Sequence, residues 1–130
     1  MKKLFVFLIV MFLFTSCGGK SESQENNLAI SDPAKILEAT AGSEFKIVIN
    51  SNPSTGYHWE LGDDLDETIV KFVSKGFNNS GLSAPGSGGR DVWIFKALTA
   101  GATHITLEYY SPSNELAEPQ QKVTFTVTVK

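Results

Sequence analysis

The sequence of 130 residues has one cysteine, two histidines and no excess of positive charge. A single cysteine excludes an internal disulfide framework and a cysteine-built zinc site, and two histidines leave little material for a metalloenzyme. The formal net charge of -3 offers no basic field of the kind that binds nucleic acid. The length allows one domain, and 42% hydrophobic residues exclude a disordered chain. We therefore expect one folded domain with no metal, no cofactor and no nucleic-acid partner.

The sequence also lacks an apolar run long enough to span a bilayer as a helix, which needs about 20 residues. The apolar run at residues 4–14 is much shorter than that, and it follows Lys2 and Lys3. A positive start before a short apolar core is typical of an export signal.

The end of this run reads Leu13-Phe14-Thr15-Ser16-Cys17 and resembles the lipoprotein box of bacterial lipoproteins. The resemblance implies that the Cys17 thiolate accepts a diacylglyceryl group and that cleavage leaves Cys17 as the mature amino terminus. Acyl chains contribute about 0.8 kcal/mol per buried methylene, so such a terminus is held on a membrane. The alternative is an ordinary secretory signal with an incidental cysteine.

Three parts of the chain follow from this interpretation. We expect residues 1–16 to be a lipoprotein signal peptide and residues 17–27 to be the lipidated cysteine with a flexible polar tether. Residues 28–130 would form the folded domain. We expect this domain to be a monomer anchored in the bacterial cell envelope, at the outer membrane or cell surface rather than the inner membrane.

No long segment from Leu28 onward has a convincing helical period, and apolar residues instead alternate with polar ones. An alternation with a period of two residues, rich in β-branched and aromatic side chains, predicts half-buried strands. Turns that contain glycine or proline separate these strands. The expected strands lie near residues 34–38, 45–50, 57–61, 70–77, 91–97, 102–110 and 122–130. About seven short antiparallel strands predict an all-β, immunoglobulin-like β-sandwich, with Trp59 where such sandwiches often bury a tryptophan.

Catalytic and metal-binding patterns are weak in this sequence. It has no Gly-x-Ser-x-Gly elbow, and the cysteine is assigned to the lipid. His58 and His104 fall on outward faces of expected strands, so each is interpreted as a solvated side chain rather than a general base. The acidic residues 62–67 lack calcium-loop spacing, and the glycine-rich residues 86–90 do not lead from a strand into a helix as a phosphate loop does. We expect a protein that is not an enzyme and has no catalytic residues.

Three loops should lie together at one end of such a sandwich. They span residues 51–56, 78–90 and 111–121; the first contains Pro53, the second is rich in glycine and the third contains two prolines. Dissimilar loops on one rigid end form a recognition surface, as antibody loops do.

Each of these loops carries a short motif. The motifs read Asn52-Pro53-Ser54-Thr55-Gly56-Tyr57, Gly86-Ser87-Gly88-Gly89 and Ser111-Pro112-Ser113. They resemble the Asn-Pro-Thr-Thr-Gly-Tyr/Phe, Gly-x-Gly-Gly and Arg-Pro-Trp/Phe motifs of the chagasin family of cysteine peptidase inhibitors. The similarity covers most of residues 34–130, but the third motif retains its proline alone.

The resemblance implies a reversible, noncovalent inhibitor of papain-like cysteine peptidases. Residues 51–56 would enter the active-site cleft, with Thr55 and Gly56 closest to the catalytic thiolate, and the other two motifs would flank the cleft. Because Pro53 fixes its own φ and Gly56 accepts a positive φ, the loop would lose little entropy on docking. The alternative is a surface adhesion or binding module that uses the same loops without inhibiting a peptidase, and the altered third motif favours it.

Overall fold

The computed structural model describes residues 28–79, 86, 88–112 and 118–130. The expected signal peptide, Cys17 and the tether lie outside the described residues, as do Ser87 and Ser113 of the expected binding surface. Among the described residues, no helix is both long enough and apolar enough to cross a membrane.

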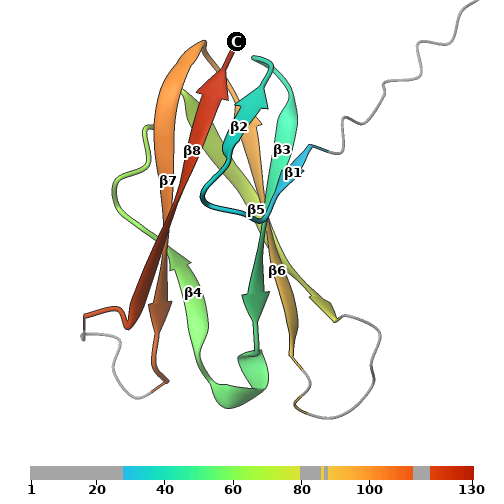
Figure 1. Ribbon diagram of the computed structural model, residues 1–130, viewed down its shortest axis with the longest axis vertical. Helices are drawn as coiled ribbons and strands as arrows, with labels where there is room; N and C mark the ends of the chain where they lie inside the picture. The colour runs from blue at the N-terminus through green and yellow to red at the C-terminus, as the bar shows by residue number, and fades with distance from the viewer. Residues whose placement is uncertain (1–27, 80–85, 87, 113–117) are drawn as a thin grey trace, which may run out of the picture.

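Two four-stranded sheets pack against each other around one hydrophobic core (Figure 1). The first sheet has the order β1 (Ala29–Ile30), β3 (Glu44–Ser51), β6 (Gly89–Ala97), β5 (Val70–Asn79). The second has the order β2 (Ile36–Ala39), β8 (Gln121–Val129), β7 (Gly101–Tyr110), β4 (His58–Leu61). A single turn of 3-10 helix, η1 (Pro53–Thr55), lies between β3 and β4.

The expected all-β sandwich is confirmed, and each expected strand overlaps an observed one. Two details differ from the expectation. The two-residue strand β1 was not expected, since two residues are too few to show an alternating pattern. In addition, β1 pairs with β3 and β2 pairs with β8 in parallel, whereas the other pairings are antiparallel. Strand direction depends on which distant segments meet, so local alternation does not report it.

Inward positions of the alternating runs form the core. The largest fully buried side chains come from both sheets: Phe45, Phe95, Phe125, Ile47, Ile105, Leu107, Val70 and Val127. The rings of Phe45 and Phe95 stack across β3 and β6 with centroids 5.6 Å apart. Each fully buried side chain of this size contributes about 1.5–3 kcal/mol, so packing holds the two sheets together without a covalent bridge.

Trp59 connects β4 to the opposite sheet at the end where β3 leads into β4. Its side chain is buried, and its Nε1 donates a hydrogen bond of 3.0 Å to the Asn50 carbonyl on β3. Its ring also packs against Tyr109 of β7, with centroids 4.7 Å apart. The expectation that Trp59 is buried is therefore confirmed, and the residue ties together the two stems of the β3–β4 connection.

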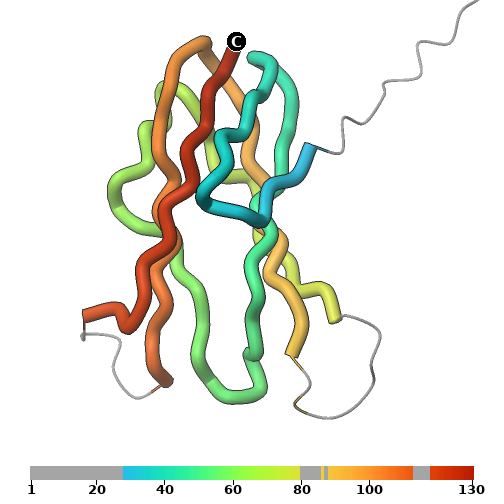
Figure 2. Tube along the Cα trace, in the orientation of Figure 1, coloured from blue at the N-terminus to red at the C-terminus, as the bar shows by residue number. Residues whose placement is uncertain are grey.

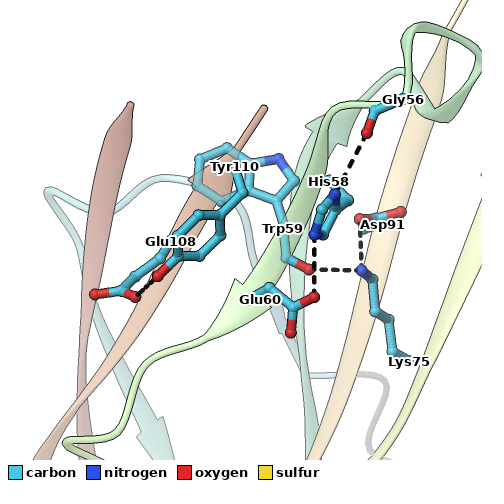
Figure 3. A network of polar contacts seen from close by, with 8 residues as sticks. All are labelled: Gly56, His58, Trp59, Glu60, Lys75, Asp91, Glu108 and Tyr110. Carbon is cyan, nitrogen blue, oxygen red and sulfur yellow. Dashed lines mark hydrogen bonds and ion pairs between the residues drawn. The ribbon is translucent and has the colours of Figure 1, made fainter. Parts of the chain in front are cut away.

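Lys75 makes a second link between the sheets, from the edge strand β5 (Figure 3). Its Nζ donates to the Trp59 carbonyl at 2.8 Å and lies 3.4 Å from Oδ2 of Asp91 and 4.6 Å from the centroid of the Trp93 ring. The side chain of Asp91 is 6% exposed, so Lys75 supplies the counter-charge to a buried carboxylate. An inward-pointing lysine on an edge strand also opposes edge-to-edge pairing with another chain.

Replacing Lys75 with methionine should destabilise the domain, because it leaves the Asp91 carboxylate buried without its cation. Removing one partner of a fully buried pair costs about 3–5 kcal/mol, and partial exposure of Lys75 reduces this to roughly 2 kcal/mol. Urea denaturation would measure the loss. Lys71→Met, on an exposed position of the same strand, is the matched control and should change stability by less than about 0.5 kcal/mol. Equal effects of the two substitutions would show that Lys75 does not hold the sheets.

Candidate functional site

The connection between β3 and β4, residues 52–57, is here called the central loop. It lies at the end of the molecule opposite the C terminus (Figure 2). No side chain of the 3-10 turn Pro53–Thr55 is buried, and Gly56 ends the turn with φ of 79°. The central loop is therefore an exposed tight turn on top of a rigid sandwich, rather than a segment folded into the core.

Hydrogen bonds within the central loop fix its shape. The Asn52 carbonyl accepts hydrogen bonds from the Thr55 amide at 3.2 Å and from Thr55 Oγ1 at 2.7 Å, and the Pro53 carbonyl accepts one from the Gly56 amide at 3.0 Å. The Ser54 hydroxyl donates to Oδ1 of Asn52 at 2.5 Å. The sequence suggested stiffness from Pro53 and Gly56, and these contacts add that the polar side chains of the loop hold it as well.

Asn52 also joins the central loop to the glycine-rich hairpin between β5 and β6. Its Nδ2 donates to the Gly86 carbonyl at 3.2 Å. Gly88 lies so close that a β-carbon there would be 3.3 Å from the Ser51 carbonyl oxygen. A β-carbon at Gly89 would come within 2.6 Å of the Phe77 ring and 2.5 Å of the Asn78 carbonyl, so this position has no room for a side chain. Gly86 and Gly88 therefore lie close to the central loop, whereas Gly89 packs closely against β5.

Pro112, the retained proline of the third motif, contacts the other side of the central loop. A β-carbon at Gly56 would lie 2.7 Å from Cβ of Pro112. Glycine is thus favoured at position 56 for two reasons: the backbone has a positive φ, and the proline leaves no room for a side chain. The described parts of the second and third loops, Gly86 with Gly88 and Pro112, thus lie on either side of the central loop.

The expected site residues take different positions at this end. Pro53, Ser54, Thr55 and Gly56 are exposed at the tip of the central loop. Tyr57 instead is half-buried, with its ring stacked on Tyr109 at 5.5 Å, so it anchors the loop to β7. Ser111 is half-buried beside the exposed Pro112. Ser87 and Ser113 belong to the part of the chain that the structure does not describe.

Two hollows flank the central loop. One, of about 460 Å³, lies between its first stem and Gly88–Arg90. The other, of about 260 Å³, lies between the loop and β5 and is lined in part by Pro53, Tyr57 and Phe77. The loop itself contains no charged residue. No group of three His, Cys, Asp or Glu side chains able to hold a metal occurs among the described residues.

His58 and Tyr110 form an aromatic pair beside the central loop that the sequence pattern does not predict. The His58 side chain lies on the outer face of the sheet and is 37% exposed, and its ring stacks on Tyr110 with centroids 6.2 Å apart. Its Nδ1 lies 3.3 Å from the Gly56 carbonyl and its Nε2 lies 3.2 Å from Oε1 of Glu60 (Figure 3). The pairing of His58 opposite Tyr110 between β4 and β7 could not be read from either strand alone.

Tyr110 belongs to a short chain of polar contacts along β7 and β8. Its hydroxyl donates to Oε2 of Glu108 at 2.6 Å, and Oε1 of Glu108 is paired with Nζ of Lys122 at 2.8 Å. Hydrogen bonds from Lys122 and then from Tyr110 lower the pKa of Glu108. The Glu108 carboxylate in turn raises the pKa of Tyr110 to about 12, chiefly through their hydrogen bond.

Comparison with known proteins adds a family match. Residues 38–129 match the family model described as the chagasin family peptidase inhibitor I42. No curated protein is similar enough in sequence to count as a match.

Several solved structures share the fold. A cysteine protease inhibitor from Entamoeba histolytica has a TM-score of 0.62 at 22% identity, covering 79% of this chain and 92% of its own. Amebosin has a TM-score of 0.59 at 19% identity, covering 80% and 98%. The ICP protein of Leishmania mexicana has a TM-score of 0.52 at 26% identity, covering 84% and 99%. These similarities confirm the expected immunoglobulin-like sandwich.

Substituting alanine for Gly56 should separate the effect of the Pro112 contact from that of backbone conformation. Gly42 has a similar φ, 88°, but a β-carbon there would meet nothing within 4 Å. Gly42→Ala should therefore lower the free energy of unfolding only by the strain of the left-handed conformation, about 1 kcal/mol. Gly56→Ala adds a clash with Pro112 and should cost at least about 2 kcal/mol. Urea denaturation of the two variants would test this, and equal losses would mean that Pro112 does not constrain the central loop.

Proposed function

This chain belongs to the chagasin family of peptidase inhibitors, and on that premise we propose that it is a reversible, noncovalent inhibitor of papain-like cysteine peptidases. Proteins of this family inhibit peptidases and are not enzymes. The observation that carries the proposal is the central loop, an exposed turn held on one side by the Asn52–Gly86 hydrogen bond and on the other by the Gly56–Pro112 contact.

The shape of the central loop supports blocking rather than cleavage. A peptidase needs a peptide carbonyl that it can approach and attack. The carbonyls of Asn52 and Pro53 accept hydrogen bonds inside the loop, and that of Gly56 faces Nδ1 of His58. The loop would thus fill the cleft without presenting these bonds for attack. Since its conformation exists before binding, little ordering entropy opposes docking.

The two flanking loops would widen the contact. Gly86 and Gly88 have no side chains, so their backbone groups could approach those of the enzyme, whereas Gly89 pairs with β3 and β5 and would support them from within the sheet. Ser87, which lies outside the described residues, belongs to the same motif. Ser111, Pro112 and Ser113 would brace the opposite side. Family members place an arginine and a large aromatic there, and losing one such anchor costs about 2 kcal/mol, or roughly 30-fold in affinity. We therefore propose weaker inhibition than the complete motif would give.

Replacing Thr55 with aspartate should abolish inhibition, because the docked loop would bury a carboxylate with no partner. Such a charge costs about 3 kcal/mol or more, which corresponds to a rise in Ki of more than about 100-fold. Residues 18–130 would be titrated against papain and several related peptidases. The matched control is Thr99→Asp, at an exposed position in the β6–β7 turn, which should leave Ki unchanged.

Two outcomes would contradict the proposal in different ways. Unchanged potency of Thr55→Asp would disprove the docking of the central loop. Failure of the unsubstituted protein to inhibit any of the peptidases at micromolar concentration would favour the surface binding module instead.

We further propose that the inhibitor domain is a monomer tethered to the bacterial cell envelope through acylated Cys17, at the outer membrane or cell surface. The support is the lipoprotein box and the polar segment between it and the domain. The tether would place the inhibitory loops outside the cell's cytoplasm, where they can meet secreted peptidases.

Acylation can be tested in a bacterium that processes lipoproteins. Labelled palmitate should enter the wild-type protein but not Cys17→Ala, and the intact mass should show removal of residues 1–16. Cleavage without incorporated label would instead identify an ordinary secretory signal.

A further inference from the structure

His58 and Tyr110 form a stacked pair on the outer face of the second sheet, directly beside the central loop. They lie opposite each other in the β4–β7 register, with their ring planes 28° apart. Both side chains are partly exposed. The pair has no role in the hydrophobic core, which the alternate positions of the same strands, such as Trp59 and Leu107, occupy.

Polar contacts hold both rings in place. Tyr110 is tied through its hydroxyl to Glu108, which Lys122 holds in turn. His58 is held between Glu60 and the Gly56 carbonyl. Aromatic side chains that are fixed before binding lose little entropy at an interface, and tyrosine is among the residues that contribute most to interface energies.

The pair is continuous with the central loop. His58 contacts Gly56 at its end, and Tyr110 is followed by Ser111 and by Pro112, which packs on Gly56. If the central loop enters the cleft of a peptidase, as proposed above, the rim of that cleft comes to lie over this pair.

The charges around the His58–Tyr110 pair indicate which kind of side chain the rim of the peptidase cleft should place against it. Glu60 and Glu108 contact the two rings, and Asp63 and Glu118 also act on the Tyr110 hydroxyl electrostatically. Two lysines lie nearby, and each is already paired with a carboxylate: Lys122 with Glu108, and Lys75, which lines the same hollow as His58, with Asp91. An aromatic face surrounded by carboxylates favours a cation, above all a guanidinium, which can stack on a ring and pair with a carboxylate at once.

We infer that His58 and Tyr110 form a second contact of the inhibitory surface, which receives an arginine side chain from the rim of the target peptidase. This inference rests on the proposed inhibition. If it is correct, a surface outside the three loop motifs helps to determine which papain-like peptidases the protein inhibits most strongly.

The test compares substitutions at Tyr110 in residues 18–130, which contain every described element. Tyr110→Leu keeps apolar bulk but removes the aromatic face, and should raise Ki about 5- to 30-fold for a peptidase with an arginine at this rim. Tyr110→Phe keeps the aromatic ring and should therefore raise Ki less than Tyr110→Leu does. Circular dichroism and urea denaturation would verify that both variants fold.

A matched control and a charge probe complete the experiment. His104→Ala removes a histidine from the same face of β7 at a position opposite Thr126, and should leave Ki unchanged. Glu60→Gln should weaken inhibition about 3-fold and reduce its salt dependence, because it removes one carboxylate that would pair with the cation.

The possible outcomes separate this inference from the proposed function. If the unsubstituted protein inhibits and Tyr110→Leu inhibits equally well across the peptidases tested, the second contact is disproved while the inhibitory function stands. If Tyr110→Leu weakens inhibition but Glu60→Gln changes neither Ki nor its salt dependence, the arginine assignment is wrong. If the unsubstituted protein does not inhibit at all, the inference fails together with its premise.

Discussion

Trp59 links the two sheets at the place where the central loop passes from one to the other. Its indole nitrogen donates to the Asn50 carbonyl on β3, and its own carbonyl accepts the ammonium of Lys75 from β5. Both stems of the central loop are thereby held at a defined separation. The loop can then be short, exposed and uncharged and still keep one shape, because the sandwich beneath it is rigid.

The loops at this end support one another by short contacts rather than by a shared core. The side chain of Asn52 makes two hydrogen bonds: its Oδ1 accepts one from the Ser54 hydroxyl within the loop, and its Nδ2 donates one to the Gly86 carbonyl in the neighbouring hairpin. On the opposite side, Gly56 and Pro112 touch. In the described residues these contacts join parts of three dissimilar loops at one end of the sandwich, and loops on a rigid scaffold are a common location of functional residues.

Within the proposed function, the residues of the interface need not be those of the family motifs. The third motif retains Pro112 in a structural role, against Gly56, whereas its expected anchors are serines. The aromatic surface nearest to it is instead Tyr110, on the adjoining strand, stacked on His58. A binding surface can thus keep its framework while the side chains that determine affinity change position.

The sequence by itself determined the strands, the inward positions such as Phe45 and Phe95, and the loops that would share one end. Alternation and turn residues are local signals, and the fold of a sandwich follows from them. The tertiary structure alone decided the parallel pairing of β1 with β3 and of β2 with β8, the bridge from Lys75 to Asp91, and the stacking of His58 on Tyr110. These features join residues far apart in the chain, and their existence depends on register and on the distance between sheets, which no local pattern encodes.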